Sequence, residues 1–402
     1  MVNVANRKQT VGVVFGSRSV EHDVSIVTAQ QIIRALDPSR YEVVPIYITR
    51  RGEWLTGPAL TDLKTFEVER IEELMGVRDT LISPSTAHHG MITPALSPML
   101  SRNQLKRLDV VFPAIHGTHG EDGTLQGLCE LADLPYVGCG VMASAIANDK
   151  ALTKVIMRAH GIPVVEGITV KRGDWQQARA QVIESLDALG YPLFVKPAKL
   201  GSSIGIARPK DAKAAAAALD VAFNLDQTVV VEKALEGALE INCAVIGNHT
   251  PRPSLLEQPI SFEEFLTYEE KYMRGGASKG MKGAERKIPA PLPQPLTEQI
   301  QQMAVAAFKA IDGRGIARVD FLLKDGEVYL NEINTMPGSL AFYLWQAEGM
   351  PPAQVVDELI RLAHEDHKDK TRTMFDYKTG LVSLAATRGL KGVKGGKFGK
   401  KF

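Results

Sequence analysis

The sequence predicts an α/β protein whose first part forms a parallel sheet. Short apolar runs with the length of buried strands alternate with stretches that have helical spacing, which is the pattern of a parallel sheet covered by helices. The first run, 11–15, is followed by a helix that begins near Glu21. Further strands are expected at 41–48 and 108–115. We therefore place a first domain at residues 1–140.

The pattern changes after residue 140. A small α+β unit is expected at 141–235, with helices over 141–160 and 211–220 and strands at 164–170, 193–196, 204–207 and 228–232. A third unit, 236–375, is expected to contain a strand at 240–246, a helix over 297–311, a strand pair at 316–323 and 328–334, and a last helix over 352–364. Residues 262–290 show no regular pattern. So long an irregular stretch inside a domain is most often a functional lid.

The composition limits the class of function. A chain of 402 residues, 45% hydrophobic and 23% charged, has enough material for two or three packed domains. The formal net charge of +1 indicates no general affinity for nucleic acid, and no stretch of 18 apolar residues predicts a membrane span. Three scattered cysteines, Cys129, Cys139 and Cys243, are too few for a disulfide framework or a zinc site, so we expect a reducing cytoplasm.

The end of the chain differs from the rest in charge. After Asp376 there are seven basic residues and no acidic residue. We expect this basic tail, 376–402, to be flexible because it has too little apolar material to offset the entropy of ordering. An electrostatic tether to nucleic acid or anionic lipid is the alternative.

Two carboxylates and an amide stand on a predicted hairpin. Arg318 and Asp320 are two residues apart, as are Glu332 and Asn334, so each pair shares one face of its strand. Two carboxylates and an amide oxygen suit a hard cation such as Mg²⁺ together with phosphate oxygens. A strict two-residue Asp-Gly turn would place Asp320 and Glu332 out of phase, so a metal site requires a bulge or an odd-length loop at 324–327. The alternative is an exposed polar face.

A loop of small residues, Leu200-Gly-Ser-Ser-Ile-Gly205, follows Lys196. It lies between two strand-like runs and lacks the Gly-Lys-Ser/Thr of a P-loop. Its backbone N–H groups and the hydroxyls of Ser202 and Ser203 can still cradle phosphate oxygens, with Lys196 supplying positive charge. The alternative is a flexible turn.

Two further loops follow predicted strands of the first domain. In one, small residues lead to Glu21 at the start of a helix, where a carboxylate also stabilises the helix dipole. The other, His116-Gly-Thr-His119-Gly-Glu-Asp-Gly123, directly follows the strand at 108–115, and α/β folds place ligands at the carboxyl ends of parallel strands. A zinc pair of His116 and His119 has no evident third ligand.

The order of these motifs resembles that of the D-alanine–D-alanine ligases, a family of the ATP-grasp superfamily. The resemblance covers about residues 8–365. It rests on Gly16-Ser-Arg-Ser-Val-Glu-His-Asp-Val-Ser25, His116-Gly-x-x-Gly-Glu-Asp-Gly-Thr-x-Gln-Gly127, Asp149-Lys150, Val195-Lys-Pro-Ala-Lys-Leu-Gly-Ser-Ser203, Glu269-Glu-Lys-Tyr272, Arg318-Val-Asp-Phe321 and Asn331-Glu-Ile-Asn-Thr-Met-Pro-Gly338. It implies a three-domain ATP-grasp architecture, with ATP between the central and C-terminal parts, and a homodimer, which is common in the family.

The resemblance also implies a role for each matching residue. Glu21, Ser202 and Tyr272 would form a hydrogen-bonded triad that positions the substrate and locks the lid, while His116 and Arg318 would stabilise the transferring phosphoryl group and the tetrahedral centre. Two Mg²⁺ or Mn²⁺ ions would be held by Asp320, Glu332 and Asn334. ATP would contact Lys150, Lys196, Ser203, Glu232, Glu240 and Lys271, although the segment from Glu232 to Glu240 is one residue longer than usual.

The reaction implied is the ligation of two D-alanines to D-alanyl-D-alanine for peptidoglycan precursor synthesis. ATP phosphorylates the carboxylate of the first D-alanine, and the amine of the second attacks the acyl phosphate. Water destroys such an intermediate, which gives the 262–290 lid a physical purpose. Tyr272 favours an amine nucleophile, because ligases that make D-alanyl-D-lactate typically lack this tyrosine.

The sequence departs from the family after Gly338. Many members continue with a Thr-Ser-x-Ser-Leu-like stretch, one serine of which contacts the carboxylate of the second substrate. Here the chain reads Ser339-Leu-Ala-Phe-Tyr343-Leu344-Trp345, and Tyr343 stands where that serine is expected. We expect Gly338, Tyr343 and Leu344 in the second-substrate pocket. The alternative is that the aromatic residues are only the packed start of a helix. D-Serine or another D-amino or hydroxy acid as second substrate, another ATP-grasp peptide ligase, and a nucleotide-binding protein without catalysis are the competing functions.

Overall fold

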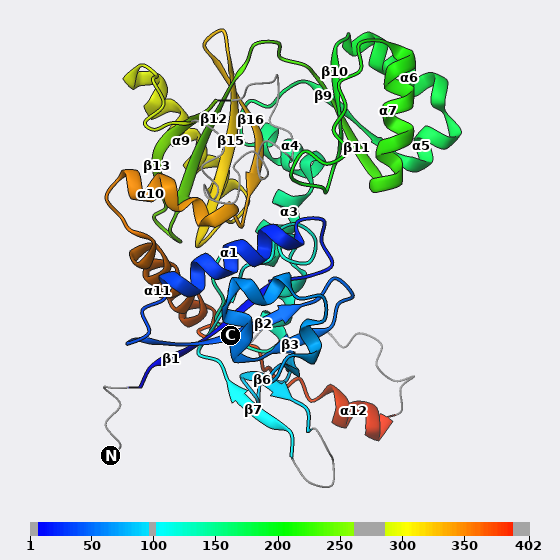
Figure 1. The fold of residues 1–402 in the computed structure, drawn as a ribbon. Coiled ribbons are helices and arrows are strands. Elements are labelled where there is room, and N and C mark those ends of the chain that lie inside the picture. The colour runs from blue at the N-terminus through cyan, green and yellow to red at the C-terminus, as the bar shows by residue number, and fades with distance from the viewer. Residues whose placement is uncertain (1–6, 96–101, 261–285, 389–402) are drawn as a thin grey trace, which may run out of the picture.

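The computed structural model describes residues 7–95, 102–260 and 286–388, whose strands form four sheets (Figure 1). The first sheet has the order β4-β3-β2-β1-β8, and its centre is parallel. There β1 (Gln9–Gly16) lies between β2 (Tyr41–Ile48) and β8 (Val110–Pro113), and α1 (His22–Ala35) connects β1 to β2. All of β1 after its first residue is buried, which explains its uninterrupted apolar run. The expected parallel α/β start of the fold is confirmed.

Short elements complete this region. An antiparallel edge is added to the first sheet by β3 (Trp54–Thr56) and β4 (Arg78–Asp79). A separate small sheet consists of β5 (Leu81–Ile82), β6 (Gly90–Thr93) and β7 (Gln104–Arg107). After β8, the His116 loop leads into α2 (Thr124–Leu131), so this loop lies at the carboxyl end of a parallel strand.

The central unit is a three-stranded antiparallel sheet of order β10-β11-β9, covered on one side by helices (Figure 1). Its strands are β9 (Gly167–Lys171), β10 (Leu193–Pro197) and β11 (Thr228–Lys233), and its helices are α5 (Arg172–Gln177), α6 (Arg179–Leu189) and α7 (Ala212–Leu225). The strand expected at 204–207 is wrong, because only a single bridge forms there, between Val195 and Ala207. Ser202, Ser203 and Gly205 have positive φ, so the chain turns instead of extending.

The single helix expected over 141–160 is also wrong, because two helices occur there. They are α3 (Val141–Asn148) and α4 (Lys150–Ala159), separated at Asp149, which has extended backbone angles (φ −96°, ψ 98°). The Asp149 carboxylate accepts hydrogen bonds from the backbone N–H groups of Ala151 (3.0 Å) and Leu152 (3.2 Å). This side-chain cap competes with helix continuation and makes Lys150 the first residue of α4.

The third sheet is antiparallel throughout and has the order β14-β13-β12-β15-β16. The strands are β12 (Leu239–Ile246), β13 (Arg252–Pro259), β14 (Arg286–Lys287), β15 (Ile316–Lys324) and β16 (Glu327–Asn334). Helix α9 (Gln294–Ala310) packs against it through Ile300, Ala304 and Phe308, which belong to the same buried cluster as Val319 and Phe321.

The hairpin β15–β16 contains the irregularity that a metal site requires, but not where the sequence suggested. Lys324 pairs with Glu327, so the turn at Asp325-Gly326 is a regular two-residue turn and the expectation of a bulge or odd loop at 324–327 is wrong. The extra residue is Asn331, because Phe321 pairs with Leu330 while Asp320 pairs with Glu332. The bulge restores the phase, and Asp320 and Glu332 therefore share a face.

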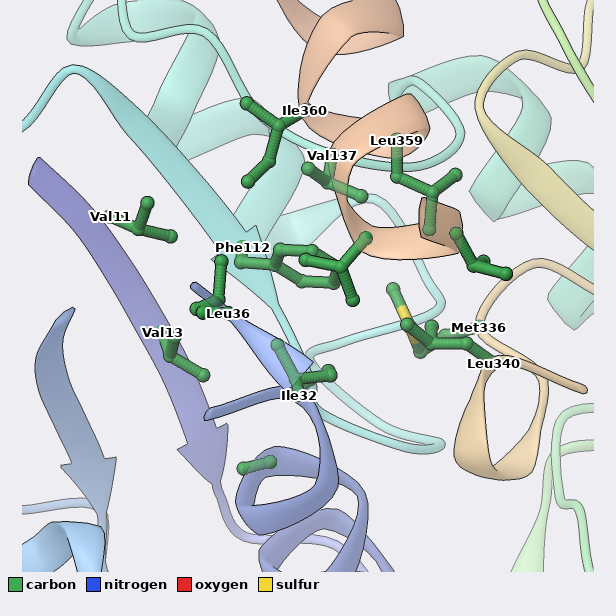
Figure 2. Close-up of a cluster of buried hydrophobic side chains, with 14 of the residues drawn as sticks. Val11, Val13, Ile32, Leu36, Phe112, Val137, Met336, Leu340, Leu359 and Ile360 are labelled. Atoms are coloured by element: carbon green, nitrogen blue, oxygen red, sulfur yellow. The ribbon is translucent and has the colours of Figure 1, made fainter. Parts of the chain in front are cut away.

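The segment after the third sheet returns to the first sheet (Figure 1). Helix α10 (Phe342–Ala347) is followed by α11 (Pro352–Lys370), which lies beside α1 and β8. Figure 2 shows Leu359 and Ile360 of α11 in one buried cluster with Phe112, Val11 and Val13. The sequence pattern grouped residues 352–370 with the third unit, but they pack into the core of the first one.

Part of the basic tail forms a helix, α12 (Leu381–Arg388), in which Val382 is exposed. The flexibility of the segment 376–402 stays a prediction. The run Leu-Val-Ser-Leu-Ala-Ala contains helix-forming residues and no acidic or basic side chain before Arg388. Residues 389–402, and 262–285 of the expected lid, lie outside the described residues. Within the described ranges, every helix is too short or too polar to cross a membrane.

Candidate active site

One cavity of about 800 Å³ collects most of the residues expected to be functional, although they come from distant parts of the sequence. Those that line it are Glu21, His116, Lys150, Ser202, Glu240, Arg318, Glu332, Asn334, Gly338 and Tyr343. Four other expected site residues, Lys196, Ser203, Glu232 and Asp320, together with Leu344, are not among its lining residues. Lys271 and Tyr272 lie outside the described residues.

Glu21 and Ser202 meet in the cavity across 181 residues of sequence. The Ser202 hydroxyl donates a hydrogen bond to the Glu21 carboxylate, which stands directly before α1. Two glycines make room for this carboxylate: a Cβ atom at Gly117 would lie 2.5 Å from Glu21 Oε2, and one at Gly201 would lie 3.0 Å from it. Ser202 and Ser203 both have positive φ (53° and 60°), a strained conformation that is typical of functional loops.

His116 is a buried, neutral imidazole. Its Nε2 lies 2.8 Å from the Thr28 hydroxyl, and only 3% of the residue is exposed. Burial lowers the pKa of His116 to about 4, an effect that a hydrogen bond to the Met336 backbone opposes and the nearby Arg318 charge reinforces. His116 is therefore uncharged at neutral pH, and it can contact a substrate through hydrogen bonds but not as a cation.

This burial makes stability depend on pH. The pKa of His116 is lower in the folded protein than the ordinary value of 6.5, so the unfolded chain takes up a proton first as pH falls. Between pH 7.5 and pH 5 we expect the wild-type protein to lose about 2 kcal/mol of unfolding free energy relative to His116→Gln, which cannot titrate. Denaturant unfolding of both proteins at the two pH values measures this difference. Equal losses of unfolding free energy in both proteins would contradict the lowered pKa of His116 in the folded protein.

Glu121 is a cavity residue that the sequence did not single out, although it lies inside the His116–Gly123 motif. Its carboxylate accepts hydrogen bonds from the backbone N–H groups of Gly117 (2.8 Å) and Met336 (2.9 Å), so it joins the His116 loop to the segment after β16. Burial, together with the charge of Glu21, raises the pKa of Glu121 to about 8. The only sequence signal for it was its place in that motif.

A buried charge cluster lies behind the cavity. The Lys196 ammonium donates to Glu232 Oε2 (2.7 Å) and to Asn331 Oδ1 (3.2 Å), and Lys154 forms an ion pair with the other oxygen of Glu232. Glu232 is 1% exposed. Burial alone would raise its pKa, but the two lysines lower the pKa of Glu232 to about 2. Lys154 was missed because a single lysine on a helix gives no sequence signal of burial.

The face of the third sheet that carries the hairpin carboxylates has a polar row across four strands. The strand register aligns Glu257, Asn242, Asp320 and Glu332, in that order. Arg318 binds Asp320 through two hydrogen bonds of 2.7 Å each. At the end of the row, Lys150 Nζ lies 3.3 Å from Glu332 Oε2. Lysine and carboxylate thus meet where phosphate and metal are expected.

This donor set fits a hard divalent cation that also binds phosphate. Asn334 lies on the same face as Asp320 and donates a hydrogen bond to it (2.9 Å), so the amide and two carboxylates are adjacent. In the described part of the chain, no three His, Cys, Asp or Glu side chains form a metal-binding cluster. A cation here would therefore depend on the Asn334 amide oxygen and on ligand oxygens, as Mg²⁺ commonly does.

A left-handed turn follows Gly338 at one end of the cavity. Ser339, Leu340 and Ala341 all have φ near +50°, which is unfavourable for residues with a side chain, and the complete burial of Leu340 and Ala341 offsets that cost. The turn leads into α10, where Tyr343 lines the cavity. Leu344 is fully buried in the core and does not line the cavity. No residue type in Ser-Leu-Ala predicts positive φ, so only the structure reveals this turn.

The likeness to known proteins covers nearly the whole described fold. Residues 10–139 match the model of the D-ala D-ala ligase N-terminus, and residues 156–361 match that of the D-ala D-ala ligase C-terminus. The chain belongs to the D-alanine–D-alanine ligase family. A curated D-alanine–D-alanine ligase from Geobacillus kaustophilus is 40% identical to it over 378 residues, which are 92% of this chain and 99% of the relative.

Solved structures of the D-alanine–D-alanine ligase family agree with the fold. The D-alanine–D-alanine ligase from Coxiella burnetii has a TM-score of 0.73 and 32% identity, with 94% of this chain and 98% of that chain covered. The VanG D-Ala:D-Ser ligase from Enterococcus faecalis has a TM-score of 0.76 and 31% identity, with 89% of this chain and 100% of that chain covered. The ATP-grasp architecture predicted from the sequence is therefore confirmed.

Proposed function

We propose that this member of the D-alanine–D-alanine ligase family joins two D-alanines to D-alanyl-D-alanine, with conversion of ATP to ADP and phosphate. The observation that supports this most is the convergence of Glu21, Ser202, Lys150 and Glu332 on one cavity. Glu21, Ser202 and Glu332 come from three separate sheets or their loops, and Lys150 comes from the start of α4. A few convergent polar groups in one cavity are typical of a binding site.

The chemistry of each end of the cavity supports the proposed order of steps. Lys150, with Lys196 behind it, supplies positive charge for the phosphates of ATP, and Glu232 and Glu240 lie on β11 and β12 for the adenosine part. Glu21, which accepts a hydrogen bond from Ser202, orients the ammonium group of the first D-alanine. The carboxylate of that D-alanine attacks the γ-phosphate, and the amine of the second D-alanine then displaces phosphate from the acyl phosphate.

Mg²⁺ or Mn²⁺ ions held by Asp320, Glu332 and Asn334 would neutralise negative charge on the phosphates. His116, which is neutral, donates or accepts a hydrogen bond at the reacting phosphoryl group. Arg318 keeps its guanidinium charged at any accessible pH, because its neighbours Asp320, Tyr343 and Glu257 raise its pKa well above the usual value against the opposing effect of burial. It is therefore suited to the oxyanion of the tetrahedral centre.

A ligase that accepts D-serine or another D-amino acid as second substrate is the second candidate. Tyr343 in place of a serine and the structural likeness to the VanG D-Ala:D-Ser ligase both favour this possibility. A homodimer also stays a proposal.

A phosphate-release screen tests the proposed function. The protein is incubated with ATP, MgCl₂ and D-alanine, alone or together with D-serine, D-lactate or other D-amino acids, and the products are identified by mass spectrometry. We expect D-alanine alone to give phosphate and D-alanyl-D-alanine in equal amounts. Phosphate release only with a mixed pair would favour the second candidate, and binding of ATP without any turnover would contradict both.

A further inference from the structure

A polar cluster surrounds Tyr343 at one end of the cavity, and no role has yet been given to its Arg286. It consists of Glu257, Asn242, Tyr343 and Arg286, and all four line the cavity. The Glu257 carboxylate accepts hydrogen bonds from the Tyr343 hydroxyl and from the Asn242 amide (3.3 Å), and its other oxygen lies 3.2 Å from Arg286 Nη1. Glu257 is 3% exposed, so this carboxylate is fully engaged within the protein.

Arg286 is held in place by two of these residues but retains unused donors. Its guanidinium carbon lies 4.1 Å from the centre of the Tyr343 ring, and the ion pair with Glu257 restrains one of its terminal nitrogens. Its side chain is 29% exposed. Within residues 7–95, 102–260 and 286–388, the Arg286 guanidinium makes no other hydrogen bond or ion pair, so Nε and Nη2 remain available to a ligand.

Among the cations that line the cavity, Arg286 is the one best placed for a second carboxylate. Lys150 is engaged with Glu332 and with the Leu200 carbonyl oxygen at the phosphate end. Arg318 uses two of its N–H groups on Asp320, and Arg34 is exposed on α1. A planar guanidinium that is stacked on an aromatic ring and held by a carboxylate is preorganised to bind another carboxylate in the bidentate manner.

We propose that Arg286 binds the carboxylate of the second substrate and thereby selects an acceptor that carries one, while Glu257 and Tyr343 act as positioning residues that orient Arg286. This inference rests on the proposed ligation of D-alanine to an amino-acid acceptor. It also gives Tyr343 a role different from that of the serine it replaces, because its hydroxyl donates a hydrogen bond to Glu257 and its ring supports the guanidinium.

An acceptor competition tests the role of Arg286 separately from the fold. D-Alanine is supplied with D-alaninamide, which has the same amine but no carboxylate and therefore acts only as an acceptor. Mass spectrometry measures the ratio of D-alanyl-D-alanine to D-alanyl-D-alaninamide. We expect Arg286→Met to lower this ratio by roughly 10- to 100-fold, which is the usual loss of affinity when a hydrogen bond to a charged group is removed. The KM for ATP should stay unchanged. Lys287→Met, on the exposed neighbouring residue of β14, is the matched control and keeps the wild-type ratio.

Two further variants separate the contribution of the Arg286 guanidinium from a general loss of folding. Arg286→Lys retains the charge without the planar fork, and we expect an intermediate ratio; it replaces Arg286→Met if that variant does not fold. Tyr343→Phe keeps the ring and removes only the hydroxyl, so the ratio should change less than in Arg286→Met. An unchanged ratio in both Arg286 variants, or an equal loss in Tyr343→Phe, would overturn the proposal. Failure of the wild-type protein to form D-alanyl-D-alanine would instead contradict the proposed function.

Discussion

Replacing Glu332 by alanine reduces D-alanine-dependent ADP release by roughly 10³-fold, or about 4 kcal/mol in activation free energy. Glu332 lies opposite Asp320 on adjacent strands, and its carboxylate is 3.3 Å from Lys150. Its removal takes away a ligand of the proposed cation site and leaves Lys150 without its carboxylate neighbour. A coupled assay of ADP formation at saturating D-alanine, across a range of MgCl₂ concentrations, measures the effect.

The matched control is Glu327→Ala, which removes an exposed carboxylate from the first position of the same strand. We expect this variant to retain wild-type turnover and thermal stability. Glu332→Ala should also keep the wild-type melting temperature, because Glu332 is only partly buried and its partner Lys150 also has the Leu200 carbonyl oxygen. Near-wild-type turnover of Glu332→Ala would refute its assignment as a metal ligand.

Replacing Lys196 by alanine has two large effects: loss of ADP release and a decrease of about 3 kcal/mol in unfolding free energy. The stability decreases because Glu232, which is 1% exposed, loses one of its two lysine partners inside the protein. The activity is lost because the proposed contact of the Lys196 ammonium with the phosphates of ATP is removed. Denaturant unfolding and the ADP assay measure the two effects separately.

Lys154→Met separates the structural contribution of this cluster from its catalytic one. Lys154 forms an ion pair with the same carboxylate, but the proposed contact with ATP belongs to Lys196. We therefore expect a loss of stability similar to that of Lys196→Ala while ADP release persists. If both variants lose activity to the same extent, Lys196 acts only by holding Glu232, and its proposed contact with ATP is wrong.

The motifs in the sequence predicted more of the site than the secondary structure pattern did. Glu21 and Ser202 were expected to act together because both lie in loops of small residues that match family motifs in order, and their hydrogen bond joins them in the structure. The pattern failed where a single side chain redirects the backbone. Asp149 caps a helix inside an apparently continuous helical stretch, and Asn331 forms a bulge that no turn residue marks.

Some cavity residues reach the cavity only because of the register in which the strands pair, and these residues could not be predicted from the sequence. Glu257 and Asn242 reach the polar face only because β13 and β12 pair in a register that aligns them with Asp320. Arg286, on the two-residue strand β14, reaches the same end of the cavity through its contact with Tyr343 from α10. None of these residues belongs to a local motif.

The sequence by itself determined the fold class, the family and the chemical nature of the site, because apolar periodicity and short loop motifs are local properties of the chain. Only the tertiary structure decided which side chains share a face, which charges are buried and which cation lies beside Tyr343 in the cavity. Those properties depend on the register of paired strands and on contacts between residues far apart in sequence. A bulge of one residue at Asn331 is enough to turn Glu332 toward Asp320 or away from it.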